Sequence, residues 1–525
     1  MSTRGFMKQK QDRYEMHKYW GKKPAFGFDK LIKTYSEPED VLFDPFAGYG
    51  VFGCEALLNN RKVVLNDLNP IAGFIQNQLL KNDFNEKHIK ETFKTIIDEL
   101  SNTEEKFFTT ACSKCGKRAI VISTLRDKNN DKPLCHKIKC SCSKQAFEQD
   151  ISEDEAQMIL NTEKDLELPP HPTSNLIQNS RISAKENMTT DDLFTIRTLY
   201  CHSVLYNKIQ SIENNTLKDY LMLAFLSNMA NCSKLVPPIK SRGKMSQGAW
   251  MTGFYIANNY IENNVFHYFK NRIEKIVAGK KDFCSKIKNI NLSYKIINND
   301  AKKLSIPNDS VDFIFTDPPY GDTVPYFEQS IIWNTWLSKQ VDYENEIVIS
   351  DSKIRNKNNA KYKSDLNKAI SEISRVLKPG KYFTISFHSL YGEEWSSLID
   401  ACFMNGFSFE QAELLKQKTL APRQLNRKIT IEGDLLLTFK KTTIKNIQLI
   451  DKEKLFVKLT TLISEELHKK SLSTNDIYLN IINYILKNRI SLGNIDIISL
   501  LKSNFEIDDY GMWHQKPILA TLAMA

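Results

Sequence analysis

The stretch VLFDPFAGYGVFGCEALL, residues 41–58, decides the fold that we predict for this chain. Val41 to Asp44 is typical of a short buried strand, and the run after Gly50 is typical of a helix. Gly48, Gly50 and Gly53 match G-x-G-x-x-G between the two. Glycines there allow positive φ and let a ligand approach the backbone at a helix N-terminus. The segment therefore predicts a strand–loop–helix unit of a doubly wound α/β sheet.

A second strand is predicted in KVVLNDLNP (residues 62–70), which ends in Asp67. An acid at this position binds ribose hydroxyls in nucleotide-binding α/β folds, so the glycines and Asp67 together predict a nucleoside-containing cofactor. The alternation of strands and helices stops after a helix near Ile71. It resumes at YKIIN (residues 294–298), which is followed by Asp300. The intervening stretch of roughly 220 residues is too long for a crossover and predicts an insertion with its own structure.

The pentapeptide DPPYG (residues 317–321) follows the apolar run VDFIFT (residues 311–316), which is a predicted strand of the same sheet. Neither proline donates a backbone hydrogen bond and both stiffen the chain, so Asp317 and Pro318 offer oxygens while Tyr320 offers a flat face. Such a pocket suits the exocyclic amine of a nucleobase. An ordinary Asp-Pro turn is the alternative for this stretch taken alone. Ligands bind at the carboxyl ends of strands in such sheets, so we expect the cofactor beside DPPY.

The size and charge of the chain are those of a multidomain protein. It has 525 residues and a net charge of +10, which fits a polyanionic partner. We find no apolar run long enough to span a membrane, and the N-terminus lacks the apolar core of a signal peptide. These features predict a cytoplasmic protein without a membrane partner.

Half of the ten cysteines fall between Cys112 and Cys142. In a reducing compartment such clustering favours a metal over disulfides. CSKCG is a C-x2-C knuckle, and the later pair completes a tetrahedral set, so we predict a structural Zn site with the ligands Cys112, Cys115, Cys140 and Cys142. The second pair is C-x-C, which is short for a knuckle and leaves Cys135 as an alternative ligand.

Taken together, DPFAGYG (residues 44–50), the acid of NDLNP and DPPY resemble the S-adenosylmethionine-dependent DNA amino-methyltransferases, which are the adenine-N6 and cytosine-N4 enzymes. The chain is similar in particular to bacterial DNA methylases that carry a Zn ribbon. The matching segments are HKYWGKKP (residues 17–24), CSKCG, DPPYGDTVPYFEQSIIWNTWL, RVLKPGKYFTISFH and the helical tail. This resemblance implies a Rossmann-like class I methyltransferase sheet with a large Zn-ribbon and helical insertion and a small helical C-terminal domain.

The resemblance also implies how S-adenosylmethionine, the co-substrate, would be held. The loop from Phe46 to Gly50 would surround the methionine part, Asp67 would bind the ribose, and Asp300 would bind the adenine amino group. His17 and Tyr19 of the N-terminal arm would close over the methionine end. The full cofactor-binding set that we expect is His17, Tyr19, Asp44, Phe46, Gly48, Gly50, Asp67, Asn69, Asp300 and Ala301.

The catalytic set implied by the resemblance is Asp317, Pro318, Pro319 and Tyr320. An exocyclic amine is a poor nucleophile because its lone pair is delocalised into the ring. Hydrogen bonds accepted by the Asp317 carboxylate and the Pro318 carbonyl would make it reactive, and the methyl group would transfer in line. Tyr320 would stack on a base flipped out of double-stranded DNA.

The chain divides into five predicted parts. They are residues 1–100 (arm and cofactor-binding half), 101–150 (Zn ribbon), 151–290 (helical insertion for DNA recognition), 291–442 (catalytic half) and 443–525 (helical or winged-helix domain). Basic segments at Lys353 to Lys363 and Lys416 to Lys428 are expected to hold DNA phosphates. The loop PPIKSRGKMSQGAWMTGFY, with Lys240, Arg242 and Lys244, fits a nucleic-acid contact or a solvated surface equally well.

Adenine N6 is the predicted methylation target, because cytosine-N4 enzymes more often have Ser in place of Asp317. Cytosine N4 and guanine N2 of tRNA are the alternatives within the class. Outside it stand a nicotinamide-dependent oxidoreductase and a catalytically inactive DNA-binding subunit. A separate restriction or defence-system partner is compatible with the chain, which has no cluster of nuclease type.

Overall fold

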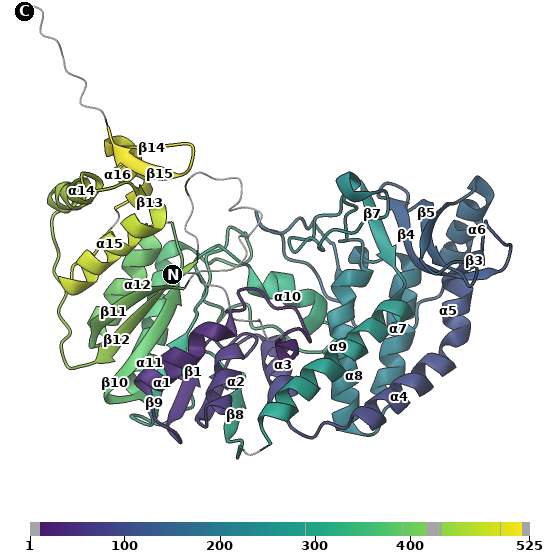
Figure 1. Cartoon of the computed structure of the whole chain (residues 1–525), viewed down its shortest axis with the longest axis horizontal. Coiled ribbons are helices and arrows are strands. Elements are labelled where there is room, and N and C mark those ends of the chain that lie inside the picture. Colours follow the sequence, from purple (N-terminus) through teal and green to yellow (C-terminus); the bar gives the residue numbers. More distant parts are fainter. Residues whose placement is uncertain are drawn as a thin grey trace, which may run out of the picture.

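The computed structural model describes residues 11–516, apart from 289, 391, 416–428, 430–432 and 494. Its central element is a seven-stranded sheet in the order β11-β12-β10-β9-β1-β2-β8, in which only β12 runs antiparallel to its neighbours (Figure 1). This mostly parallel sheet confirms the predicted Rossmann-like α/β fold. The strands are β1 (Val41–Asp44), β2 (Lys62–Asn66), β8 (Tyr294–Ile297), β9 (Val311–Thr316), β10 (Leu377–Phe387), β11 (Phe407–Leu415) and β12 (Asp434–Lys441).

Alternate residues of β9 enter two different cores, because successive side chains of a strand point to opposite faces. Phe313 and Phe315 join the core with α1 (Phe28–Tyr35) and α2 (Val51–Leu58), whereas Ile314 joins the core with α11 (Asn359–Val376) and α12 (Gly392–Met404). All six residues of β9 are buried. Helices therefore cover both faces of the sheet, as its uninterrupted apolar strands require.

The order in which strands are added to the sheet reverses beside β1. β2 and β8 follow on one side of β1, and β9 and β10 lie on the other. In open α/β sheets ligands bind outside the carboxyl ends of the strands at such a switch point. β1 and β9 end in Asp44 and Thr316, immediately before the glycine loop and DPPY. The fold thus brings these two motifs to one edge.

The expected insertion lies between α3 (Pro70–Leu80) and β8, and Figure 1 shows it extending to the side of the sheet. Its helices are α4 (Glu86–Glu99), α5 (Ser101–Phe107), α6 (Glu153–Lys164), α7 (Ile196–Gln210), α8 (Asn215–Met229) and α9 (Val265–Lys286). Its strands are β3 (Thr109–Ala111), β4 (Arg118–Asp127), β5 (Pro133–Lys139), β6 (Phe147–Asp150) and β7 (Asn259–Asn263).

The predicted ribbon and helical parts share one sheet, which extends across the boundary drawn at residue 150. β7 pairs with β4 although it follows α8 in the chain. Buried charges support the same junction: Arg126 of β4 donates to Glu163 of α6 and, at 2.7 Å, to Glu262 of β7. Replacing one partner of such a pair leaves a buried charge unmatched. The strand was missed because NYIEN is short and polar at both ends.

The C-terminal part has the topology of a winged helix, one of the two expected forms. It runs α14 (Lys452–Leu467), β13 (Leu472–Ser473), α15 (Thr474–Lys487), α16 (Ile497–Asn504), β14 (Phe505–Ile507) and β15 (Met512–Gln515). The three strands form an antiparallel sheet in the order β13-β15-β14. Its apolar residues continue the core around α11 and α12. The Tyr478 hydroxyl also donates to the carbonyl of Leu390 at 2.8 Å.

Among the described residues, no helix is long and apolar enough to cross a membrane.

Candidate active site

The glycine loop after β1 is held by the acid that follows β2. The Asp67 carboxylate accepts the backbone N–H of Gly48 at 2.7 Å and that of Asn69 at 2.9 Å. Gly48 has φ +50°, and a Cβ there would lie 3.1 Å from the Tyr19 ring. Gly50 has φ +87° and is the N-cap of α2. Both glycines are thus required by the local backbone.

Burial sets the charge state of the acids at these strand ends. It raises the pKa of Asp67 to about 6, against the two backbone N–H groups that lower it. Burial likewise raises the pKa of Asp44 well above its usual range. Asp44 accepts the Phe46 N–H and the Thr316 hydroxyl, each at 3.1 Å, and so ties the end of β1 to the end of β9.

DPPY begins where β9 ends. The Asp317 carboxylate receives the Tyr320 hydroxyl and lies 3.0 Å from the ammonium of Lys23. Burial and the charge of Asp434 raise the pKa of Asp317, while Lys23 lowers it. The Pro319 carbonyl accepts the Tyr362 hydroxyl at 2.9 Å, which fixes the turn to α11.

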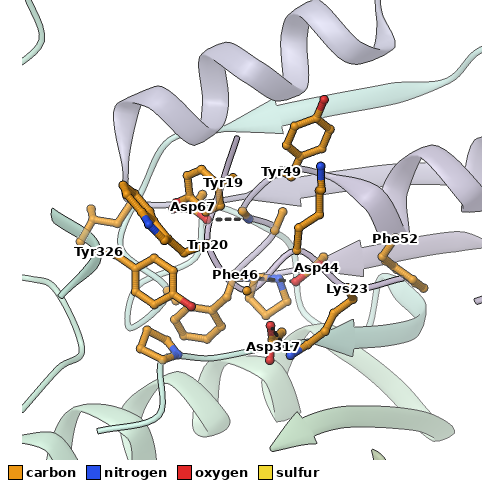
Figure 2. Close-up of a pocket in the computed structure, with 18 of the residues that line it drawn as sticks. Tyr19, Trp20, Lys23, Asp44, Phe46, Tyr49, Phe52, Asp67, Asp317 and Tyr326 are labelled. Carbon is orange, nitrogen blue, oxygen red and sulfur yellow. Dashed lines mark hydrogen bonds and ion pairs between the residues drawn. The ribbon is translucent and has the colours of Figure 1, made fainter. Parts of the chain in front are cut away.

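A cavity joins the two motifs (Figure 2). Its empty volume is about 870 Å³, including its open mouth. The predicted residues that line it are Tyr19, Asp44, Phe46, Gly48, Asp67, Asp300, Ala301, Asp317 and Pro319. The lining thus includes four predicted aspartates and part of the glycine loop, together with Glu346, which was not predicted.

The other predicted site residues are not among those that line this cavity. Gly50 is the N-cap of α2, and Pro318 is buried. Asn69 is buried and donates to Ser330 of α10 (Tyr326–Asn334) at 2.9 Å, so it fixes a helix beside the pocket. The Tyr320 ring packs edge-on against Phe387, with its hydroxyl turned toward Asp317.

The N-terminal arm closes one side of the cavity. Tyr19 lines it, and the Asn69 amide donates to the Tyr19 hydroxyl at 3.3 Å. His17, predicted at the cofactor, is instead 3% exposed and packs edge-on against Trp333 at 4.7 Å. Burial lowers the pKa of His17 to about 3, so the ring is neutral. His17 therefore braces the arm from behind.

Most of the lining residues were not predicted individually, and Trp20, Lys23 and Tyr326 are among them. Tyr19 and Tyr326 have nearly parallel rings with centroids 6.2 Å apart, and Figure 2 shows both beside the loop of Phe46. Trp20 and Lys23 belong to HKYWGKKP, which was noted as a motif without a role for either residue. Their combination of aromatic, basic and turn residues was the available signal.

Two cations of one basic segment predicted to grip DNA are buried and paired within the protein, whereas Lys353, Lys361 and Lys363 of that segment are exposed. Arg355 donates to the carboxylates of Glu328 and Glu346, and Lys357 donates to the carbonyls of Glu344 and Glu346. Arg355 and Lys357 are 7% and 3% exposed. They hold the loop that carries Glu346 against the cavity, because a buried cation is tolerated only when paired. The second segment, Lys416 to Lys428, lies outside the described residues apart from its flanks.

The four predicted metal ligands come together. The sulfurs of Cys112, Cys115, Cys140 and Cys142 all lie within 4.8 Å of one another. They sit in the turns β3–β4 and β5–β6. Cys135 is buried in β5, where its sulfur contacts the His136 carbonyl at 3.7 Å, outside the cluster. Four thiols at this spacing suit a tetrahedral ion such as Zn²⁺.

Two family models match the chain. One describes a DNA methylase and matches residues 311–494, from β9 into the winged helix. The other describes a D12 class N6 adenine-specific DNA methyltransferase and matches residues 28–216, from α1 into α8. The first contains DPPY, and the second contains the glycine loop and Asp67. A comparison with curated proteins gives no match.

Several solved structures are similar over part of the chain. A SAM-dependent methyltransferase from Methanosarcina mazei is 12% identical, with 29% of this chain and 68% of that one covered and a TM-score of 0.17. A protein assigned as a DNA modification methylase from Thermus thermophilus is 17% identical, with 30% and 57% covered and a TM-score of 0.18. An rRNA methyltransferase from Streptomyces viridochromogenes is 7% identical, with 79% and 81% covered and a TM-score of 0.24. Likenesses this low add nothing about function.

Proposed function

We propose that this chain, which matches family models of DNA methylases over residues 28–216 and 311–494, methylates the N6 amine of adenine in a specific sequence of double-stranded DNA. The observation that carries the proposal is the position of Asp317. Its carboxylate faces the same cavity as the Gly48 loop and Asp67. The proposed site for the methyl donor and the carboxylate that would accept an amine N–H thus lie in the same cavity.

The cavity fits S-adenosylmethionine, which when bound supplies a methyl group on a sulfonium. Gly48 lines the cavity without a side chain and with φ +50°, so a ligand can lie close to its backbone. Asp67 and Asp300 line the same cavity, in places that suit a ribose and an adenine amine. Tyr19 lines the cavity next to Gly48. These contacts orient the donor, and orientation is a large part of catalysis in group transfer.

Asp317 and DPPY act on the acceptor. The carboxylate accepts an N–H of the amine, and the Pro318 carbonyl accepts the other, which localises the nitrogen lone pair for attack. No covalent enzyme intermediate is needed. A base within a duplex does not reach such a pocket, so the target is flipped out and stacks on Tyr320. The aromatic walls of Trp20 and Tyr326 exclude water.

The insertion is the proposed reader of the DNA sequence. Its loop with exposed Lys240 and Arg242 also carries Trp250, which packs against Trp20 of the arm at 6.2 Å. Exposed cations on a loop that reaches the arm suit a phosphate backbone. The Cys cluster fixes the turns of this insertion if it holds Zn²⁺, as its donor set suggests. A nuclease partner in a restriction or defence system remains a prediction.

Adenine is favoured over cytosine because the match over residues 28–216 is to an N6 adenine-specific class. The deciding experiment is sequencing of DNA from cells that express the chain, by a method that detects modified bases. We expect N6-methyladenine at one short sequence. Detection of N4-methylcytosine would show that the target base is cytosine and not adenine. Unmodified DNA would contradict the proposed function. Cells expressing the Asp317→Ala variant provide the matched control.

A further inference from the structure

The Tyr320 hydroxyl has hydrogen-bonding neighbours of opposite kinds, Asp317 and Lys23, and it also lies 3.2 Å from the Ser386 hydroxyl. It donates to Oδ1 of Asp317 and accepts from Nζ of Lys23 at 3.0 Å. The Lys23 side chain is 8% exposed, and its ammonium also lies 3.0 Å from Oδ2 of Asp317 and 2.9 Å from Oδ2 of Asp434. The three donors of Lys23 thus have three partners. An acceptor and a donor are presented side by side at the catalytic end of β9.

This pair complements one kind of nucleobase edge. Adenine carries an amine N–H next to the ring nitrogen N1, and cytosine carries one next to N3, so both present a donor beside an acceptor. Guanine and thymine present a carbonyl oxygen beside a ring N–H, which is the reverse order. A carboxylate beside an ammonium therefore matches the first two bases and opposes the others, and flipped bases are read by hydrogen bonds to this edge.

We propose that Lys23 donates a hydrogen bond to the ring nitrogen beside the methylated amine, while Asp317 accepts from the amine. Without a base, the Tyr320 hydroxyl makes the two hydrogen bonds that the base would make. It donates to Asp317, as the amine would, and it accepts from Lys23, as the ring nitrogen would. When a base enters, the hydroxyl leaves both partners and the ring is free to stack. This inference rests on the proposed function and adds a specificity-determining residue from the arm.

Asp434 keeps Lys23 in place for this task. Its carboxylate begins β12, next to β10 in the sheet, and shares the ammonium with Asp317. If Lys23 withdrew, two buried carboxylates would face each other without a cation, which is costly. The ammonium therefore stays near Asp317 whether or not a base is present. In Figure 2 the Lys23 chain runs from the arm directly to Asp317.

The test removes the ring nitrogen from the DNA. Duplex oligonucleotides carry the site found by sequencing, with the target adenine either normal or replaced by 1-deazaadenine (3-deazacytosine if the target is cytosine). For the unaltered chain we expect kcat/KM to fall roughly ten- to a hundredfold with the deaza base, as for a lost hydrogen bond to a charged group. A Lys23→Met variant should be slow on both DNAs and show no further fall.

Lys22→Met is the matched control. Lys22 also lines the cavity, but its ammonium donates to the Tyr14 carbonyl, so this variant should keep the full deaza penalty. Equal rates of the unaltered chain on the two DNAs would overturn the inference alone, even if Lys23→Met does not fold. A full penalty in a folded Lys23→Met variant would do the same. No methyl transfer by the unaltered chain to any DNA would overturn the proposed function, and this inference with it.

Discussion

Asp317 is the side chain on which the acceptor chemistry depends. In an Asp317→Ala variant the amine loses its acceptor, whereas the Gly48 loop and Asp67 remain in place. We expect methyl transfer to fall at least roughly a hundredfold, as when an active site loses a group that stabilises the transition state. Cofactor affinity measured by calorimetry should change little. Undiminished turnover would rule out the proposed role.

The matched control lies on the same strand. Asp312 is also buried in β9, but it accepts from Lys378 at 2.7 Å and from the Val41 N–H at the far end of the strand. Asp312→Asn should lower the free energy of unfolding by about 1–3 kcal/mol, because a buried charged hydrogen bond is weakened. Methyl transfer at 25 °C should persist. Parallel losses in both variants would indicate a general folding defect.

Asp67 gives cofactor binding a pH dependence. Its pKa is raised to about 6, so the carboxylate is mostly ionised at pH 7.5 and mostly protonated at pH 5. Only the ionised form accepts both a ribose hydroxyl and the Gly48 N–H fully. We therefore expect the Kd for S-adenosylmethionine to rise as pH falls through about 6. In Asp67→Asn the affinity should be weaker and this step absent; a step that persists would assign it to another group.

At the scale of elements, two turns of the insertion form the proposed Zn site. We expect one Zn²⁺ per chain by elemental analysis, and a lower melting temperature after chelation, because metal binding to such a site stabilises the fold. Cys112→Ser should lose the metal. Cys135→Ser is the matched control and should keep it, since Cys135 lies outside the four-sulfur cluster. Freshly purified protein without zinc would contradict the site.

The loop that carries Glu346 is a second element with a testable anchor. Arg355 joins Glu328 of α10 to Glu346, and burial and the charge of Glu328 raise the pKa of Glu346. Arg355→Ala leaves these carboxylates without their cation, so we expect the free energy of unfolding to fall by about 3–5 kcal/mol. Denaturant titration measures this. Lys353→Ala, at an exposed position of the same loop, should stay within about 0.5 kcal/mol of the unaltered chain.

At the scale of the molecule, the winged helix and the catalytic sheet share one core. Gly392 begins α12, and a Cβ there would lie 1.8 Å from the Ile495 carbonyl of the winged helix. Gly392→Ala should therefore lower the melting temperature by several degrees in calorimetry. Gly73→Ala in α3 is the control, because its Cβ would meet nothing closer than 3.9 Å and alanine favours a helix. Similar stability of both variants would refute the tight junction.

The sequence predictions were accurate for strands that are buried on both faces and are recognisable from their own residues. Val41 to Asp44 and Val311 to Thr316 were predicted with the bounds of β1 and β9, because short apolar runs buried on both faces carry a strong local signal. β7 and β11 were missed. β11 is the edge strand of its sheet and mixes half-buried residues with Glu410 and Glu413. Edge strands often carry charged residues, which prevent pairing with other chains, so the apolar pattern alone does not reveal them.

By itself the sequence determined the chemistry available at each strand end: the glycines at positive φ, the acids after β1, β2 and β9, and the two cysteine pairs. These depend on residue type and near neighbours. Only the tertiary structure decided that Lys23 faces Asp317, that His17 braces the arm, and that Arg355 is a buried anchor. Their partners lie far away in the chain, and a charge or ring acquires its role only when folding removes water and brings its partner within contact distance.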